Sequence, residues 1–254
     1  MAIATSRTID VLEALGESQD PLSLADIVAA TGIGRASAGR LLSSMIEGAT
    51  VVAEGDPPRY RLGLRCWSLG TGALRQRPAV GVALPYLIEL ARALNTRVNI
   101  SLPEGMEMVF VQSVEPVGTR LTVQPIYTRT RLLETASGRI VAAFADNEAL
   151  GRLSAEGLPK LTPYTRTTAE VIADLPEVRR KGYAVIDRER DLDVSGVALP
   201  IRDRTGSVVA AVGLPILGPM STEFVSGVLS AALDVATRIS VELGFPMRQS
   251  LPLA

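Results

Sequence analysis

Apolar residues near the N-terminus recur at helical spacing and predict two short consecutive helices. The first is expected over residues 23–30, with Ser23 as its N-cap and Asp26 three positions later, a spacing close to a capping box. The second is expected over residues 34–47, after a short turn that contains glycine. A helix, a turn with glycine and a second helix form the helix-turn-helix arrangement, whose second helix lies in the DNA major groove.

Two short segments of alternating character, 51–53 and 59–62, follow and predict a β-hairpin closed by a turn rich in glycine and proline. Such a hairpin is a wing, and Arg59 and Arg61 would bring two positive charges to the phosphate backbone. No acidic residue interrupts residues 32–45. Two amphipathic helices and a hairpin are nonetheless common, so the pattern alone leaves DNA binding and a purely structural module as equal alternatives.

The remaining pattern predicts one earlier helix and a second domain. Residues 64–76 suggest a connecting helix that Gly70 and Gly72 should bend or fray. Beyond it, strands in antiparallel runs are interleaved with helices, which indicates an α+β fold with helices packed on a sheet. The expected helices cover residues 6–15, 80–94, 137–144, 148–154, 167–182 and 221–243, and the expected strands cover residues 97–102, 107–114, 120–124, 183–187, 194–202 and 207–214.

Length and composition fit a globular protein of two domains, because the chain has 254 residues, of which 47% are hydrophobic and 21% charged. The formal net charge is −1, and residues 1–66 contain six arginines against eight acidic residues. Any affinity for DNA must therefore come from arginines gathered on one face, and from doubling that face in a dimer. We find no signal peptide, disulfide framework or apolar run long enough to span a membrane, so a cytoplasmic location is expected.

Enzyme chemistry has little support in the sequence. The chain contains no histidine, which excludes Ser-His-Asp and Cys-His machinery and the usual zinc sites, and it has no phosphate-binding glycine loop. No cofactor and no metal ion are therefore expected. Carboxylates at Asp187, Glu189 and Asp193 could perform acid–base chemistry, although a loop of alternating charges is more often solvated. An enzyme acting on a small acid or amide, with the winged domain used for dimerisation, is the alternative.

Small residues at 135–138 precede an apolar helix and leave backbone N–H groups free at its N-terminus. Such a helix start can hold a carboxylate or another anion. The plainer interpretation is that Thr135 or Ser137 caps the helix, and the spacing favours this second interpretation.

Three segments of the first domain, residues 22–27, 34–42 and 59–63, resemble the winged helix-turn-helix of IclR-type bacterial transcription regulators. Segments of the second domain are similar to the effector domain of the same family. These segments are residues 135–138, 182–185, 197–201 and 208–212.

The resemblance implies a winged helix-turn-helix domain at 1–64, a linker helix at 65–78 and a GAF-like α/β effector domain with an antiparallel sheet at 79–254. Effector domains of the family bind small organic acids or related metabolites, and the proteins act as homodimers or dimers of dimers. The chain is therefore expected to be a sequence-specific regulator, more often a repressor, whose partners are double-stranded operator DNA and a small organic effector, with no membrane. A sensor that binds a ligand and a protein partner, but no DNA, is a further alternative.

The residues that match the family's motifs are the candidate sites. For DNA contact they are Ser23, Arg35, Ala36, Ser37, Arg40, Arg59 and Arg61. For effector binding the resemblance implies Asn99, Phe110, Ala136, Ser137, Gly138, Asp187, Asp193, Gly196, Val197, Leu199 and Gly213.

Several positions depart from the family's pattern, among them residues 95–97, Leu133 and Asp193, and four of the departures are glycines at the candidate sites. Gly34 stands for a proline and Gly39 for a large residue in the second helix, where an interior glycine costs about 1 kcal/mol relative to alanine. Gly196 and Gly213 stand for a cysteine and a serine in the second domain. Loss of these polar side chains is expected to leave a roomier pocket with fewer donors, which suits a ligand with apolar or aromatic bulk, such as an aromatic acid or an acyl derivative.

Overall fold

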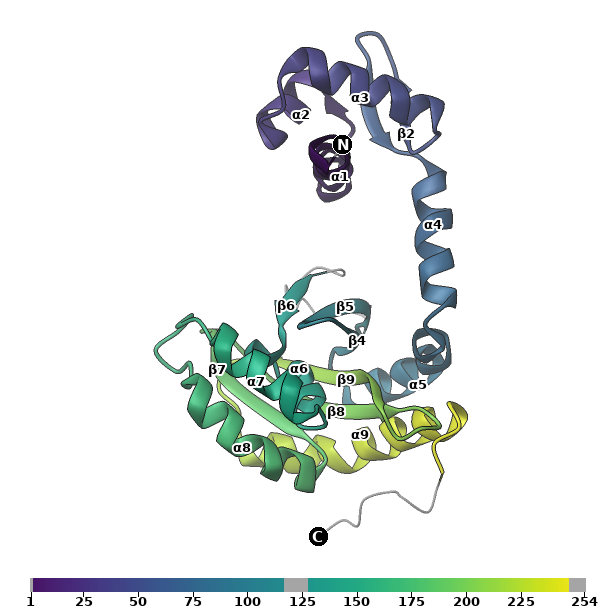
Figure 1. Cartoon of the computed structure of the whole chain (residues 1–254). Coiled ribbons are helices and arrows are strands. Elements are labelled where there is room, and N and C mark those ends of the chain that lie inside the picture. Colours follow the sequence, from purple (N-terminus) through teal and green to yellow (C-terminus); the bar gives the residue numbers. More distant parts are fainter. Residues whose placement is uncertain (1, 117–127, 247–254) are drawn as a thin grey trace. The chain divides into compact units, whose positions relative to one another are not determined.

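The computed structural model describes residues 2–116 and 128–246 and divides the chain into two compact units, Met1–Gln76 and Arg77–Ala254. Each unit combines helices with an antiparallel sheet, which confirms the expected α+β class (Figure 1). A separate linker was expected at 65–78, and the helix found there is grouped with the first unit.

The apolar faces expected in the first unit meet in a single core, where Val11, Ile27 and Leu42 from three helices are fully buried. A small sheet with strand order β1-β3-β2 closes the unit, and the hairpin formed by β2 and β3 is the predicted wing. The elements of this unit are α1 (Ala2–Glu17), β1 (Leu22–Ser23), α2 (Leu24–Thr31), α3 (Arg35–Glu47), β2 (Val51–Glu54), β3 (Arg59–Leu62) and α4 (Leu64–Arg75).

Local capping fixes where α2 begins and ends. The side chain of Ser23 accepts a hydrogen bond from the backbone N–H of Asp26, whose carboxylate accepts one from the backbone of Ser23. This capping box confirms the predicted start of the helix. Gly32 ends the helix with φ at 67°, a left-handed conformation that most other residues adopt only with strain. The turn from α2 into α3 is therefore set by the sequence itself.

Helix α4 runs without interruption from Leu64 to Arg75, so the fraying expected at Gly70 and Gly72 is not found. A glycine weakens a helix by about 1 kcal/mol but removes no backbone hydrogen bond, and two such penalties do not break this one. The helix carries its large apolar side chains outward within its own unit: Leu64 is 82% exposed and Trp67 is 73% exposed.

The second unit is built on a six-stranded antiparallel sheet with strand order β6-β5-β4-β9-β8-β7. The strand expected at 120–124 lies outside the described residues, and the short strand β6 at the sheet edge was not expected. The strands are β4 (Val98–Glu104), β5 (Glu107–Val114), β6 (Arg129–Arg131), β7 (Ala184–Asp191), β8 (Val194–Arg202) and β9 (Val208–Leu217).

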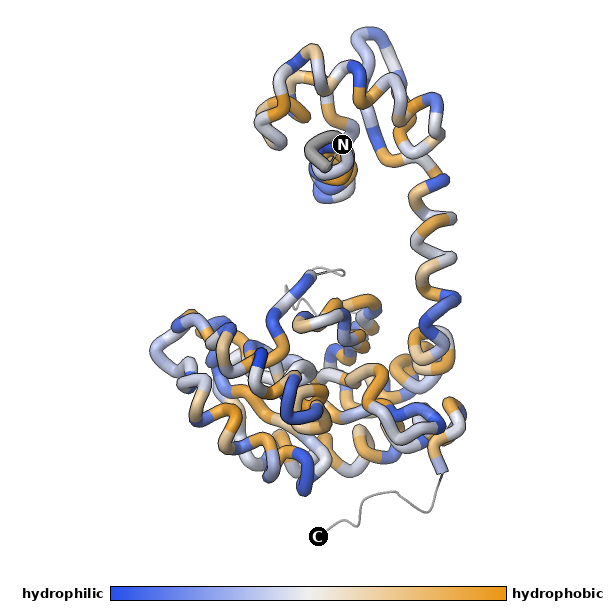
Figure 2. Tube along the Cα trace, in the orientation of Figure 1, coloured by the Kyte–Doolittle hydropathy of each residue, from blue (hydrophilic) through white to orange (hydrophobic). Residues whose placement is uncertain are grey.

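Helices cover the two faces of this sheet. α5 and α9 pack on each other, and against β4 and β8, while α6 packs on β7, β8 and β9 (Figure 1). Hydrophobic residues follow the strands and the helices that face them, and hydrophilic residues gather in the turns (Figure 2). The helices are α5 (Pro78–Leu94), the 3₁₀ turn η1 (Leu132–Glu134), α6 (Ala136–Ala142), α7 (Asn147–Glu156), α8 (Thr168–Lys181) and α9 (Thr222–Glu242).

Helix α8 begins and ends where the sequence predicts. Thr167 and Glu170 form a second capping box at its start, and Gly182 takes a left-handed conformation with φ at 77° at its end. This helix packs on α7, and Leu175 joins the core cluster that also contains Ile140 of α6.

One helix in the described ranges, α9, is long and apolar enough to cross a membrane when judged by length and composition alone. The sequence analysis found no such run because charged residues interrupt the segment. The structure places Val235 and Ile239 in the protein core, and α9 packs on α5 and β8. Core helices of globular proteins satisfy the same criterion, so α9 is weak evidence for a membrane.

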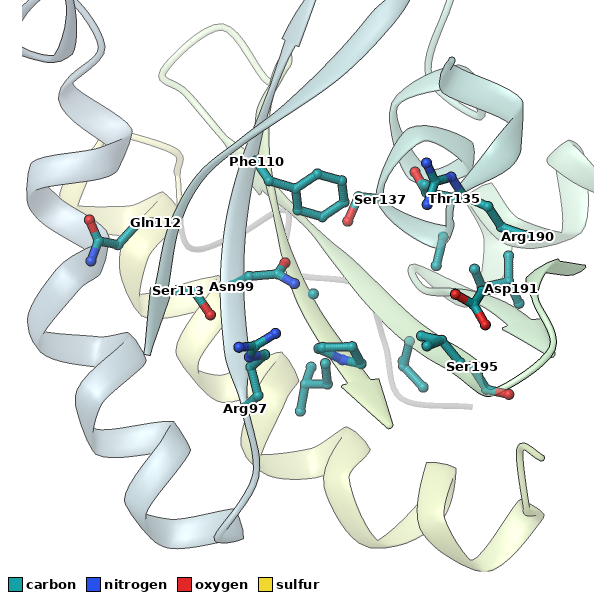
Figure 3. A pocket seen from close by; sticks show the side chains of 18 residues that line it. Arg97, Asn99, Phe110, Gln112, Ser113, Thr135, Ser137, Arg190, Asp191 and Ser195 are labelled. Atoms are coloured by element: carbon teal, nitrogen blue, oxygen red, sulfur yellow. The ribbon is translucent and has the colours of Figure 1, made fainter. Parts of the chain in front are cut away.

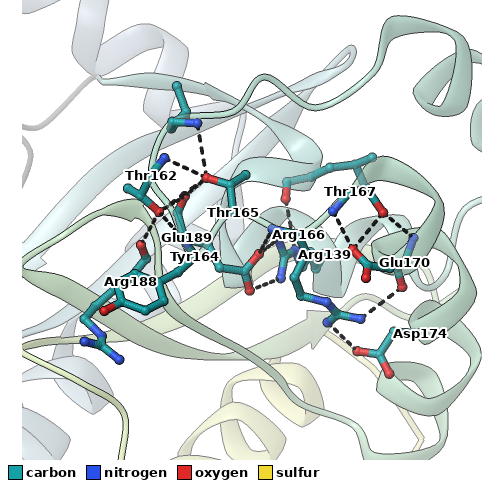
Figure 4. Close-up of polar contacts among 12 residues, drawn as sticks. Arg139, Thr162, Tyr164, Thr165, Arg166, Thr167, Glu170, Asp174, Arg188 and Glu189 are labelled. Carbon is teal, nitrogen blue, oxygen red and sulfur yellow. Dashed lines mark hydrogen bonds and ion pairs between the residues drawn. The ribbon is translucent and has the colours of Figure 1, made fainter.

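A buried ion pair joins α6 to β7 (Figure 4). Two guanidinium nitrogens of Arg139 donate to the two carboxylate oxygens of Glu189 at 2.8 and 2.6 Å, and the Arg139 Nε donates to the carbonyl of Leu133 at 3.0 Å. Their side chains are 3% and 8% exposed. The pairing of β7 with β8 is interrupted between Asp187 and Asp191, and Arg188 has φ at 52° in this bulge, where Glu189 meets Arg139.

The segment between α7 and α8 is tied to the same bulge. Hydroxyls of Thr162 and Thr165 donate to the backbone carbonyl of Glu189, the second at 2.6 Å (Figure 4). The guanidinium of Arg188 lies over the Tyr164 ring, 4.2 Å from its centroid. The bulge in β7 is therefore held by α6 through Arg139 and by the segment between α7 and α8.

Replacement of Glu189 by Gln would keep the side chain's size but leave the buried Arg139 charge unpaired. We expect the free energy of unfolding of the second unit to fall by about 3–5 kcal/mol. Urea-induced unfolding followed by circular dichroism measures the change. Glu177→Gln, which breaks an exposed pair with Arg180, is the control and should change the unfolding free energy little. Equal losses in the two variants would show that burial of the pair is unimportant.

Gly39 lies inside α3, and a Cβ placed there would meet no atom within 4 Å. Gly39→Ala should therefore stabilise the first unit by about 0.5–1 kcal/mol, because alanine loses less backbone entropy in a helix. Thermal unfolding measures the shift. Gly63→Ala is the matched comparison, since its Cβ would collide with the carbonyl of Ala49, and it should destabilise the same unit. A lower melting temperature for Gly39→Ala would refute the prediction.

Candidate functional site

Helix α3 separates an apolar face from a polar one. Ala38, Leu42 and Met45 are buried against the rest of the first unit. Arg40 Nη2 donates to the Ser37 hydroxyl at 3.3 Å, and the structure shows no hydrogen bond or ion pair for the Arg35 side chain within the part of the chain that it describes. The four candidates on this helix lie on the other face, with Ser37 half-buried and the rest exposed: Arg35, Ala36, Ser37 and Arg40.

Both arginines of the wing are exposed but already have partners. Arg59 donates to the carbonyl of Pro21 at 2.8 Å, and Arg61 donates from Nε to the Glu54 carboxylate at 3.0 Å. This hydrogen bond raises the pKa of Arg61 and lowers the pKa of Glu54. To reach a phosphate, Arg61 would have to exchange one anion for another.

Ser23 and Arg65 are two further polar residues of this unit that lie near the helix-turn-helix and the wing. Ser23 is occupied as the cap of α2, and its hydrogen bonds lower the pKa of Asp26. Arg65 was not a candidate, although it is exposed and donates to the carbonyl of Gly48, just after α3, at 2.7 Å. Its position in the sequence, directly after the wing and at the start of α4, could have marked Arg65 as a candidate.

The second unit contains a cavity on the α6 side of its sheet, with about 850 Å³ of empty space, part of which is open to solvent (Figure 3). Ser113, Asn99 and Gly213 lie directly opposite one another on β5, β4 and β9, so their side-chain positions share one face. All three line the cavity. Its apolar lining includes Phe110, Ile186, Val194, Val197, Leu214 and Pro215.

Two arginines at the cavity already face carboxylates. Arg97 is 8% exposed and forms an ion pair with Glu115, and burial lowers its pKa. Arg190 pairs with Glu134 at 3.5 Å. Asp191 adds a further negative charge to the lining. The cationic groups of the cavity are thus largely compensated by acidic neighbours.

The sequence matches two descriptions of one family in succession. These are the IclR helix-turn-helix domain over residues 4–52 and the bacterial transcriptional regulator IclR C-terminal domain over residues 71–241. The chain belongs to the IclR family of bacterial transcription regulators. It is therefore a DNA-binding transcription regulator and not an enzyme.

Individual IclR-type proteins are similar to this chain over nearly their whole length. The HTH-type transcriptional repressor AllR of Escherichia coli (strain K12) is 27% identical over 250 residues, which is 95% of this chain and 92% of AllR. The structure of an IclR transcriptional regulator from Alicyclobacillus acidocaldarius has a TM-score of 0.80 and 24% identity, covering 96% of this chain and 100% of the other. An IclR homologue from Microbacterium hydrocarbonoxydans, complexed with 4-hydroxybenzoate, has a TM-score of 0.79 and 24% identity, covering 94% and 98%.

Most of the effector-site candidates of this IclR-type chain line the cavity. They come from four strands and the start of α6, which lie far apart in the sequence and meet only in the fold (Figure 3). These residues are Asn99, Phe110, Ala136, Ser137, Gly196, Val197 and Gly213. Whether a ligand contacts each of them stays a prediction.

The other candidates lie outside the cavity lining. Asp193 is exposed, and Leu199 is buried opposite Val212, one position away from the pair that Ala198 forms with Gly213, so its side chain points to the other face of the sheet.

Asp187 serves a structural purpose instead. Its carboxylate accepts hydrogen bonds from Ser195 and from the backbone N–H of Met220, both at 3.0 Å, and from Arg188. Together these bonds lower its pKa, with the bond from Arg188 the largest cause. The carboxylate thus ties β7 to the segment after β9.

Gly138 and Thr135 explain the motif of small residues before α6. The Thr135 hydroxyl accepts the N–H of Gly138 at 3.1 Å, so the capping interpretation is confirmed. A Cβ at Gly138 would collide with the backbone of Leu132, so close packing requires glycine there. Thr135, Ala136 and Ser137 still line the cavity.

Several lining residues were missed by the sequence analysis. Arg97 was predicted only as the first residue of a strand, and Ser113 becomes visible only through its register with Asn99. Arg190 and Asp191 lie in the bulged strand, where simple alternation fails. The described residues contain no group of three or more His, Cys, Asp or Glu side chains placed to hold a metal ion.

Arg40→Ala should weaken binding to an operator by about 1–3 kcal/mol if this side chain reads a guanine edge. Arg40→Lys separates base reading from phosphate contact, because lysine keeps the charge but cannot form the two parallel hydrogen bonds. Fluorescence anisotropy with DNA from upstream of the protein's own gene measures both variants. Arg152→Ala, on the surface of α7, is the control. Unchanged affinity in Arg40→Ala would remove this residue from the interface.

Proposed function

We propose that this IclR-type regulator represses transcription from an operator and that a small organic ligand in the cavity changes its affinity for that DNA. The observation that carries the proposal is the cavity itself, which combines apolar walls with a few polar side chains from separate strands. AllR, similar to this chain along nearly its whole length, is named a repressor, which supports the same direction of regulation.

The cavity lining favours a ligand with aromatic or other apolar bulk. Phe110 presents its ring to the cavity beside Ser137 (Figure 3), and Ile186 and Pro215, which lie opposite Gly196 on the neighbouring strands, add apolar surface. The Microbacterium hydrocarbonoxydans homologue, which shares this fold, is complexed with an aromatic acid, 4-hydroxybenzoate. A ligand of this size can bury an apolar ring while its polar group meets the strand side chains.

Gly213 does not enlarge the cavity, although the absence of a side chain there was expected to do so. A Cβ at this position would collide with Asn99 Oδ1, so the side chain of Asn99 fills the space that the glycine leaves. At Gly196 a Cβ would have ordinary contacts of 3.7 Å or more. The cavity therefore keeps a hydrogen-bonding side chain beside Gly213, that of Asn99 on β4.

We propose that the protein acts as a homodimer or a dimer of dimers. The highly exposed Leu64 and Trp67 are three residues apart on α4 and share one helix face, which a partner chain would cover. A two-fold dimer would bind a pseudo-palindromic operator, with half-sites about one helical turn apart. Doubling the arginine face also offsets the weak overall charge of the first unit.

Aromatic ligands should release or tighten the DNA complex at concentrations where pyruvate and glyoxylate have no effect. Fluorescence anisotropy of the operator complex, titrated with benzoate, benzamide, pyruvate and glyoxylate, measures this. Phe110→Ala should reduce affinity for the aromatic ligands about tenfold, because it removes ring contact worth roughly 1.4 kcal/mol. Much tighter binding of pyruvate or glyoxylate than of either aromatic compound would refute the proposed ligand class.

A further inference from the structure

Asn99 is a polar side chain of the cavity that has no hydrogen bond among the described residues. The residue is 9% exposed, and its Oδ1 is buried without a hydrogen-bond partner among the residues that the structure describes. No hydrogen bond is seen for its amide nitrogen within the same ranges. Figure 3 shows the carboxamide pointing into the cavity. Buried polar atoms are nearly always paired, so an unpaired carboxamide at a cavity points to a group that arrives with a ligand.

We propose that the ligand carries a donor and an acceptor side by side, as a carboxamide or hydrazide does, and that this group pairs with the carboxamide of Asn99. The inference rests on the proposed function of the cavity and names the polar end of its ligand. It concerns which of two related compounds, an aromatic acid or its amide, the cavity prefers.

The register of the sheet holds Asn99 in place. It lies opposite Gly213 on β9 and opposite Ser113 on β5, and the missing side chain at Gly213 leaves the space that its carboxamide occupies. A Cβ at position 213 would also lie 3.3 Å from the Ser137 hydroxyl. Asn99 and Ser137 thus converge on one spot of the cavity wall, from β4 and α6.

A carboxylate is a poor match for this spot. An ionised carboxylate only accepts hydrogen bonds, so it could pair with the amide nitrogen of Asn99 but would leave Oδ1 unsatisfied. The positive charges that would favour it are compensated, because Arg97 pairs with Glu115 and Arg190 with Glu134. Asp191 adds negative charge to the same cavity.

A carboxamide matches this part of the cavity wall both in its charge and in its hydrogen-bonding groups. It is uncharged, so the cavity's acidic residues do not repel it. Its N–H donates to Oδ1 of Asn99 while its carbonyl accepts from the Asn99 amide nitrogen, which satisfies both groups at once. The hydroxyls of Ser137 and of Ser113, whose Oγ is buried without a partner among the described residues, can serve a further N–H of a hydrazide.

Isothermal titration calorimetry on the full-length protein tests the preference with two matched pairs of probes. The pairs are benzamide with benzoate and 4-hydroxybenzamide with 4-hydroxybenzoate, which differ in charge and donors but hardly in shape. We expect each amide to bind at least tenfold more tightly than its acid. In Asn99→Leu, which keeps a side chain of similar size without polar atoms, the preference should fall below threefold.

Two further variants separate this contact from general damage. Gly213→Ala retains Asn99 but pushes its carboxamide away, so it should also erase the preference for amides. Asn147→Leu, an exposed change at the start of α7 outside the cavity, should leave the preference intact. Thermal unfolding of each variant confirms that it is folded.

The outcomes distinguish this inference from the proposed function. Acids that bind as tightly as their amides in the unaltered protein, or a preference that survives in both Asn99→Leu and Gly213→Ala, would overturn the inference while leaving a ligand-responsive regulator. Such a result would mean that water satisfies Asn99. If neither member of either pair binds, the aromatic ligand class proposed for the cavity fails, and this inference fails with it.

Discussion

The buried pair of Arg139 and Glu189 is the constraint on which the second unit depends most. A charge in a protein interior is tolerated only when an opposite charge and hydrogen bonds surround it, and here the two arise on α6 and on the bulge of β7. The pair therefore fixes how the helix that supplies Ser137 meets the strand that supplies Arg190 and Asp191. One interaction thus joins the α6 side of the cavity to its β7 side, and it specifies geometry more than it adds stability.

The chemistry of the cavity follows from strand register in the same way. Ser113, Asn99 and Gly213 come from three strands and face one space only because β4 pairs with β5 on one side and β9 on the other. A shift of one residue would turn Asn99 to the opposite face of the sheet. The cavity is apolar along much of its wall, compensated in charge, and polar at a few points that a ligand must match.

The DNA-binding unit shows how placement outweighs total charge. Its arginines are outnumbered by acidic residues, yet Arg35 and Arg40 are exposed on α3, opposite the face that packs into the core. Arg61 and Arg59 are held by Glu54 and by the Pro21 carbonyl before any DNA is present. Contacts of this kind orient long side chains and would reduce the entropy lost in a proposed phosphate contact, which for Arg61 would also require release from Glu54.

The sequence by itself determined the features that depend on neighbouring residues. Helical and alternating periodicities located the helix-turn-helix, the wing and most strands, and the boxes at Ser23 and Thr167 set where two helices begin, because these signals act within a few residues. Only the tertiary structure decided that Arg97 and Ser113 line the cavity, that Asp187 is a structural acceptor, and that Leu199 faces away from the cavity. Those outcomes depend on pairing between distant strands and on a bulge, which local periodicity does not encode.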